Sequence, residues 1–210
     1  MQAIGSKIEV SGTSDINVGT GSVTFANTDN NFTGAVSLTA ADATINDKNA
    51  LTLGTLTVTQ SLDVTSHGDL VLGTGTVGTA TTAGTLTIHT NNYNLTQQSG
   101  GLAVTGTTDL QAGTGIVTLT DPANSFSSTV TATAASLELT AASALTVGVL
   151  RADNATLTTT DVLKLGDVHV TNDLDATGTK GIEQLPAQQA LLVVDGKAKF
   201  TSTTGDVVLT

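Results

Sequence analysis

Pairs of apolar residues separated by one polar residue recur along the chain, as in Val23/Phe25 and Val117/Leu119. Because side chains alternate across a β-strand, each pair predicts a short strand with one buried face. Clusters of Gly, Asn and Asp separate the pairs, and these residues reach the conformations that tight corners need. No segment shows a convincing helical period. The other pairs are Val36/Leu38, Leu51/Leu53, Leu56/Val58, Leu62/Val64, Leu70/Leu72, Leu86/Ile88 and Leu102/Val104.

The sequence also repeats itself over a longer distance. Residues 13–58 align without a gap onto residues 107–152, an offset of 94, with 18 identities in 46 positions. Most of the differences exchange one apolar or hydroxyl residue for another. Residues 201–210 resemble 111–120 in the same way. Self-similarity at a fixed period is typical of solenoids and other repeat architectures.

The repeat predicts one continuous solenoid over residues 1–210. Its units cover approximately 8–101 and 102–190, and a third unit starts at 191–210. We expect the chain to be a piece of a longer array, entered inside one unit and left inside another. Residues 171–190 break the pattern with a proline and a Glu/Gln-rich run. They predict a longer corner between coils, or alternatively a protruding loop or short helical turn.

Composition decides between the two architectures that fit many short strands, a sandwich and a solenoid. Aromatic residues are 2% of the chain, whereas a sandwich needs longer strands and a core of large side chains. The 43 Thr residues are β-branched and favour extended backbone. We therefore expect an all-β fold, a right-handed parallel β-helix. With about 19 residues per coil it would hold about five coils per 94-residue unit and about eleven in all, ~50 Å long at ~4.8 Å per coil.

Charge and cysteine content exclude several function classes. The net charge is −11 with seven basic residues, so nucleic acid, whose phosphates would be repelled, is not an expected partner. There is no Cys, which excludes disulfides and thiolate chemistry. No apolar run approaches the ~18 residues of a membrane span, so we expect no membrane insertion. Residues 1–12 also lack the apolar stretch of a signal peptide.

Residues 113–148 and 92–115 resemble the repeat regions of filamentous haemagglutinin-like exoproteins, which are large bacterial surface adhesins. The resemblance covers nearly the whole chain and is weakest at 171–190. It implies a β-helical shaft that is secreted or held at the bacterial cell surface, with an outer-membrane secretion partner of the two-partner type. It also implies a role in adhesion, biofilm or cell contact, with a surface receptor bound by parts outside this chain. Open strand edges would further allow end-to-end self-association.

The three histidines give little sign of a metal site. His89 and His169 lie between residues of inward-facing pairs and should point outward. His67 and His89 are 22 residues apart, so one possibility is that they lie side by side on adjacent coils. No third ligand is evident, and solvated histidines are the simpler interpretation.

Four carboxylates gather in the C-terminal third, at Asp161, Asp167, Asp173 and Asp175. Calcium needs several oxygen ligands that converge on one turn. The calcium-binding nonapeptide and the EF-hand loop are both absent from the sequence. Bound calcium is left as an alternative to solvated turn carboxylates.

An enzyme would need paired carboxylates or basic residues on one face, often with aromatic platforms for sugar rings. The Phe residues at 25, 32, 126 and 200 fit inward or corner positions, and Tyr93 is the one plausible exposed aromatic. A polysaccharide-binding or polysaccharide-processing β-helix is therefore an alternative without a supporting constellation. We expect no catalytic, cofactor-binding or metal-binding residue, and no cofactor.

A second alternative is an ice-binding solenoid, because outward threonines on a flat face can order water. Threonines alternate at Thr55/Thr57/Thr59, Thr85/Thr87 and Thr118/Thr120. An ice-binding face would need these motifs in register on successive coils, and their spacing in the sequence is irregular. The expected function is the structural shaft of a secreted or surface-anchored bacterial adhesin.

Overall fold

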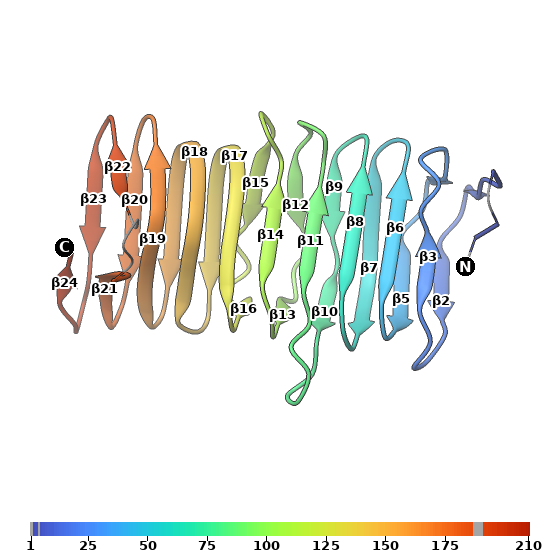
Figure 1. Ribbon diagram of the computed structural model, residues 1–210, viewed down its shortest axis with the longest axis horizontal. Coiled ribbons are helices and arrows are strands. Elements are labelled where there is room, and N and C mark those ends of the chain that lie inside the picture. Colours follow the sequence, from blue (N-terminus) through green and yellow to red (C-terminus); the bar gives the residue numbers. More distant parts are fainter. Residues whose placement is uncertain (1, 4, 187–190) are drawn as a thin grey trace.

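The computed structural model describes residues 2–3, 5–186 and 191–210. Within these residues the chain forms twenty-four strands and no helix. It winds into a solenoid in which each coil contributes strands to three parallel ladders (Figure 1). The expected all-β, parallel β-solenoid fold is confirmed.

Long strands near the C-terminal end bend from one ladder to the next, so they appear in more than one of the following sets. The first ladder contains β2 (Ser14–Asn17), β5 (Val36–Ala40), the end of β7 (Leu51–Val58), β10 (Thr74–Val77), β13 (Leu102–Val104), β16 (Ser125–Phe126), the starts of β18 (Leu145–Thr159) and β19 (Val162–Val170), β21 (Gly181–Gln184) and β24 (Val207–Val208). The second ladder contains β3 (Val23–Phe25), β6 (Ala43–Asp47), β8 (Leu62–Ser66), β11 (Leu86–His89), β14 (Thr108–Gln111), the start of β17 (Thr129–Ala141), the middle of β18, the end of β19 and β22 (Leu192–Val194). The third ladder contains β1 (Glu9–Val10), β4 (Asn31–Phe32), the start of β7, β9 (Leu70–Leu72), β12 (Leu95–Gln97), β15 (Ile116–Leu119), the ends of β17 and β18, β20 (Leu174–Gly178) and β23 (Ala198–Thr201).

The coil length varies, which corrects the expected coil of about 19 residues. Val36 pairs with Leu53, 17 residues later, whereas Gly75 pairs with Leu102, 27 residues later. Across the described residues the second ladder has nine levels, from Val23 in β3 to Val193 in β22. The expectation of about eleven coils was therefore wrong, because the corners between strands take up more residues than a uniform coil allows.

The 94-residue repeat does not correspond to five coils either. Second-ladder pairing runs from Val23 in four steps to Thr108. The repeat equivalent of Val23 is Val117, which lies on the next strand along the chain, in the third ladder. One repeat is therefore four coils plus one strand, so equivalent residues lie on adjacent faces of the solenoid.

The winding sense is visible in Figure 1, in which the chain advances from right to left. Its nearer strands, such as β6, β8 and β11, run upward, and the more distant strands run downward. This combination makes the coil right-handed, as the preference for right-handed parallel crossovers predicts.

The core is a single stack of small apolar side chains along the solenoid axis. Burial alternates along each strand, and both members of the pair Val117/Leu119 are fully enclosed. Phe32 and Phe126, which occupy equivalent repeat positions, are the largest buried side chains. Valine, leucine and isoleucine stack on their own kind from coil to coil, as in the series Leu51, Leu70 and Leu95.

Two segments depart from the regular coil. Residues 78–84 form a small hairpin, closed by an antiparallel bridge between Gly78 and Ala83, that projects below the shaft in Figure 1. The sequence patterns did not reveal it. In the irregular stretch 171–190, strands β20 and β21 continue the ladders, and residues 187–190 lie outside the described part.

Candidate functional site

Hydroxyl side chains align on one face of the first ladder. Thr39 pairs with Thr57 and Thr57 with Thr76, while Thr55 pairs with Thr74. The Oγ of Ser37 accepts a 3.1 Å hydrogen bond from the Thr55 amide and so lies beside it. These six residues, here called the threonine array, are half-buried or exposed.

The alignment corrects a premise of the sequence analysis. Threonine alternation that is irregularly spaced in the sequence is in register here, because the coils differ in length. The array is short, however. It spans three coils and ends where Asn17 pairs with Thr39 on one side and Ala103 with Thr76 on the other. The alternations at Thr85/Thr87 and Thr118/Thr120 do not extend it.

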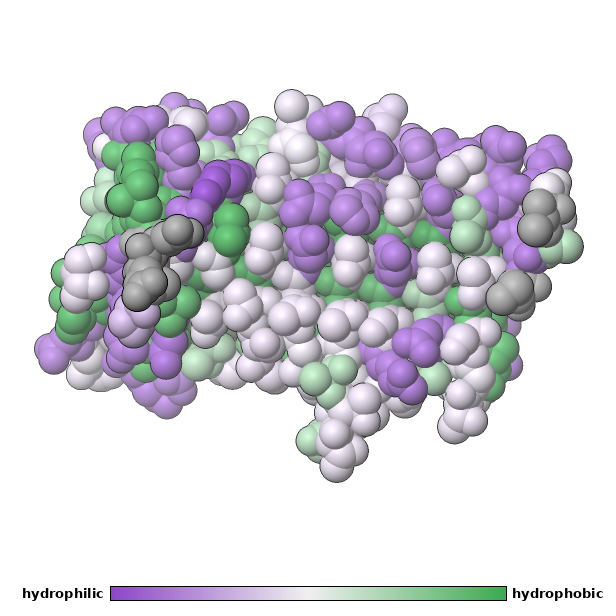
Figure 2. Space-filling model, viewed as in Figure 1, coloured by the Kyte–Doolittle hydropathy of each residue, from purple (hydrophilic) through white to green (hydrophobic). Residues whose placement is uncertain are grey.

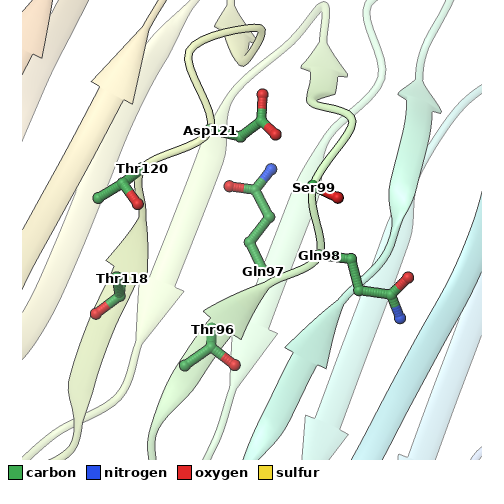
Figure 3. A pocket seen from close by; sticks show the side chains of 7 residues that line it. All are labelled: Thr96, Gln97, Gln98, Ser99, Thr118, Thr120 and Asp121. Carbon is green, nitrogen blue, oxygen red and sulfur yellow. The ribbon is translucent and has the colours of Figure 1, made fainter.

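A shallow polar groove of about 260 Å³ lies on the third ladder between β12 and β15 (Figure 3). In Figure 3, Gln97 points along the groove toward Asp121, while Gln98 points away toward the neighbouring coil. The amide of Gln97 is held by Asn124, whose Nδ2 donates a 2.9 Å hydrogen bond to it. The groove is lined by Thr96, Gln97, Gln98, Ser99, Thr118, Thr120 and Asp121.

Asp121 is the one carboxylate in this groove, and it is occupied by the backbone. Its Oδ2 accepts a 2.7 Å hydrogen bond from the Gly100 amide and its Oδ1 a 2.8 Å bond from the Ala123 amide. These bonds keep the pKa of Asp121 below its usual value. The groove has neither a base nor a second carboxylate beside Ser99, so its lining offers hydrogen bonds but no acid–base pair.

The acidic residues of the C-terminal third are not brought together. Asp161 pairs with Lys180 at 2.6 Å, Asp167 pairs with Arg151, and Asp175 pairs with Lys199 at 2.8 Å. The hydrogen bond from Lys180 lowers the pKa of Asp161. Asp173 accepts a 3.0 Å hydrogen bond from the Lys197 amide. Each of the four therefore contacts a neighbouring coil at its own place, and the described residues contain no cluster of three or more metal-ligating side chains.

The histidines are also separate. His89 and His169 point outward, as expected, and the Nε2 of His169 lies 3.6 Å from a carboxylate oxygen of Asp195. The in-register neighbour of His89 on the preceding coil is Thr65. His67 lies beyond that strand at a corner, with its Nδ1 3.1 Å from the carbonyl oxygen of Asp47. The possible side-by-side pair of His67 and His89 is therefore not formed.

The aromatic residues lie where the sequence placed them. Phe32 and Phe126 are buried, while Phe25 and Phe200 are partly buried against the core. The rings of Phe25 and Phe32 stack with their centroids 6.0 Å apart. Tyr93 is 48% exposed, but no second aromatic residue is exposed beside it among the described residues to form a sugar-binding platform.

Sequence reasoning missed a set of buried polar side chains that close the corners. Asn124 accepts a 2.9 Å hydrogen bond from the Leu102 amide and donates one of 3.3 Å to the Leu119 carbonyl. Its repeat equivalent, Asn30, makes the matching bonds to Ile8 and Phe25. The signal was available, because this asparagine is one of the identities between the two repeats.

Asp47 closes a corner as a buried carboxylate. Its oxygens accept hydrogen bonds from the amides of Phe32, at 2.7 Å, and Asn49, at 3.0 Å. Burial raises the pKa of Asp47, and these two hydrogen bonds only partly offset that effect. Ser66 serves the corner of the next coil by donating a 2.8 Å hydrogen bond to the Gly68 carbonyl. These polar groups satisfy backbone atoms and are not directed at a ligand.

The outer surface seen in Figure 2 is mostly hydrophilic or near neutral, with larger hydrophobic areas at the left, C-terminal end. Exposed apolar residues of that end include Leu191, Val207 and Val208. Among the described residues there is no helix long and apolar enough to cross a membrane.

Comparison with known proteins gave one match. Four segments of the chain, residues 1–39, 40–76, 68–133 and 152–210, match the family model described as "Repeats of unknown function (DUF5649)". Neither the curated proteins nor the solved structures contain a match. The matched segments cover most of the chain and fit the repeated coils of the solenoid, and the chain therefore belongs to this family of repeats.

Proposed function

We propose that this chain is a structural shaft segment of a secreted or surface-anchored bacterial adhesin, with no catalytic role. The observation that carries the proposal is the second ladder, whose parallel pairing links nine successive levels without a break. At ~4.8 Å per level, such a ladder makes a rod ~40 Å long from 210 residues.

Two features of the sides of the rod support a spacer role. The polar side chains inside are used to close corners, as Asn30, Asp47 and Asn124 do. The charged side chains outside pair between coils, as Lys180 does with Asp161 and Lys199 with Asp175. Such pairs add little to stability at an exposed surface, but they favour one register of coil on coil.

The adhesin context comes from the resemblance of residues 92–148 to filamentous haemagglutinin-like shafts. Within this proposal, a secretion partner in the outer membrane exports the full-length protein, and a separate part of it contacts the receptor. The shaft then sets the distance between that part and the cell surface.

Whole-coil deletion in the full-length protein tests the shaft role. Ser136 pairs with Asn154 one coil later, so deleting residues 136–153 removes one coil and keeps the ladders in register. We expect surface display and cell adhesion to persist, because a spacer depends on length and register and not on one coil's side chains. A matched deletion of residues 136–144 leaves part of a coil and should abolish display. Loss of adhesion by a whole-coil variant that is still displayed would refute a purely structural role.

The threonine array supports a second candidate, an ice-binding surface. Its hydroxyls repeat at ~4.8 Å between coils and at two-residue steps along each strand, a regular array that can order water. Thermal hysteresis of the purified chain measures this activity. A hysteresis that is lost on replacing Thr57 with a lysine would favour it, and ordinary freezing would leave the shaft as the one proposal.

A further inference from the structure

Three asparagines of the chain begin the tripeptide Asn-X-Thr, with X other than proline, at residues 31–33, 94–96 and 154–156. This tripeptide is the acceptor for N-glycosylation. It occurs easily by chance in a chain with 43 Thr residues, so its presence alone decides little. The placement of the three tripeptides on the solenoid is more informative.

All three asparagines lie at the start of a third-ladder strand, on the same edge of the solenoid. Each directly precedes an inward-facing residue of that ladder, namely Phe32, Leu95 or Ala155. Asn94 and Asn154 are exposed and Asn31 is half-buried, while the threonines at 33, 96 and 156 are all exposed. The acceptor groups therefore face outward along one line.

The spacing along that edge is regular although the sequence spacing is not. From Leu95 the register passes through Val117 and Leu137 to Ala155, which is three coils. From Asn31 it passes through Asn49 in the next coil, then from Leu51 to Leu70 and on to Leu95, again three coils. At ~4.8 Å per coil, the acceptors lie ~14 Å apart.

The side-chain amides are held in one orientation. The Oδ1 of Asn94 accepts a 3.0 Å hydrogen bond from the Ile116 amide, and that of Asn31 accepts one of 3.0 Å from the side chain of Asn49. The Oδ1 of Asn154 accepts a longer bond of 3.5 Å from the Asp173 amide. The Nδ2 of each is the atom that would form the glycosidic bond, and within the described part of the chain none of the three donates a hydrogen bond.

We propose that Asn31, Asn94 and Asn154 are N-glycosylated and form a line of sugars along one edge of the solenoid. In this reaction a bond forms between Nδ2 and C1 of a sugar activated as a diphosphate. The C1–O bond to the diphosphate breaks, the diphosphate leaves with the bonding electrons, and one amide proton passes to a base of the transferase. The inference does not depend on the shaft role, because it rests on the positions of the acceptors.

Sugars at these positions would cover the edge where apolar surface is exposed. Tyr93 and Ile116 flank the Asn94 acceptor, and both are about half exposed. Thr96 of the same tripeptide lines the polar groove of Figure 3, so a sugar on Asn94 would also lie beside that groove. The other two edges and the threonine array would stay uncovered.

Glycopeptide mass spectrometry of the full-length protein, purified from the cells that make it, tests the proposal. We expect sugar masses on Asn31, Asn94 and Asn154 and none on Asn92 or Asn172, which are exposed but begin no acceptor tripeptide. Additions of single sugars would indicate a nucleotide-linked donor, and a preassembled oligosaccharide would indicate a lipid-linked donor. Fewer than two modified sites among the three would overturn the proposed line.

Threonine variants separate this assignment from other modifications. Thr96→Val and Thr156→Val keep the asparagine and suit an exposed strand position, so the fold should persist while the sugar at that site is lost. Thr118→Val, on the same ladder but outside any tripeptide, should leave all three sites modified. A mass that persists on Asn94 after Thr96→Val would contradict N-glycosylation at this tripeptide.

Discussion

Replacing Asn124 with alanine tests whether buried corner asparagines stabilise the solenoid. The side chain of Asn124 is fully buried and satisfies two backbone groups, the Leu102 amide and the Leu119 carbonyl. Leaving a buried polar group without its partner costs about 1–3 kcal/mol. With two such groups, Asn124→Ala should destabilise the surrounding coils by about 2–6 kcal/mol.

The effect should be local, because each coil of a solenoid contacts only its neighbours. Native-state hydrogen exchange measures it at the amides of β13 and β15, whose opening free energy should fall by that amount. Asn172→Ala changes an exposed asparagine and serves as the control, with an expected effect within ~0.5 kcal/mol. An Asn124→Ala effect as small as the control would refute the corner argument.

The repeat supplies a second check of the same reasoning. Asn30 makes the equivalent bonds to Ile8 and Phe25, so Asn30→Ala should produce a similar loss in its own coils. The two sites are separated by about four coils, ~20 Å along the axis. Sites so far apart act independently, so the double variant should show the two losses at two separate places.

Three further substitutions have clear expected outcomes. Thr108 is buried in the core with no hydrogen-bond partner for its Oγ1, so Thr108→Val should raise the denaturation midpoint by the equivalent of about 1–3 kcal/mol, and an unchanged or lower midpoint would contradict the orphaned hydroxyl. Val117→Asp places an unpaired charge in the core and should cost more than ~3 kcal/mol by denaturant unfolding, whereas Thr118→Asp on the outward side should cost little, and equal effects would disprove the inward–outward assignment. Because burial raises the pKa of Asp47 above 3.8, the folded state binds its proton more tightly than the unfolded state, and that stabilisation is present below pH ~3.8 and lost as the pH rises through the folded pKa. Asp47→Asn does not ionise, so it should gain stability relative to the unmodified protein between pH ~3 and ~6, and a gain in the opposite direction would show that the hydrogen bonds outweigh burial.

The strand pattern could be predicted from the sequence because it depends on local alternation. Inward pairs such as Leu62/Val64 are buried as expected, since a short strand with one face in the core needs no knowledge of its neighbours. The register of one coil on another could not be predicted in the same way. It depends on how many residues each corner takes up, and the alignment of Thr57 with Thr76 became visible only once the coils of variable length were stacked.

Two corners show what the sequence did and did not contain. The hairpin at 78–84 adds residues between β10 and β11, flanked by Gly78 and Gly84, and a long interval between inward pairs was its one signal. Asn124 was visible as a repeated identity, but its role depends on the Leu102 amide 22 residues away. Chemical sites were expected to be absent, and the structure brings the histidines and carboxylates into no common cluster among the described residues.

The mismatch between repeat and coil leads to a last prediction about how the array is built. Because one 94-residue repeat is four coils plus one strand, deleting one repeat should keep every local contact but turn the remaining shaft by one face. Deleting residues 51–144 places Leu145 where Leu51 was. Thr44 then occupies the position of Glu138, which pairs with Thr156, although in the intact chain Thr44 pairs with Asp63.

A disulfide can detect this rotation, because the chain contains no cysteine. With Thr44→Cys and Thr156→Cys, paired positions on adjacent parallel strands lie within the Cα separation of about 4.4–6.8 Å that a disulfide spans. Oxidation should cross-link the two cysteines in the deletion variant and not in the full chain, where they lie on different ladders several coils apart. Cross-linking that is absent from a folded deletion variant would mean that the downstream coils kept their original face. The repeat would then be a record of sequence duplication that does not set the register of the coils.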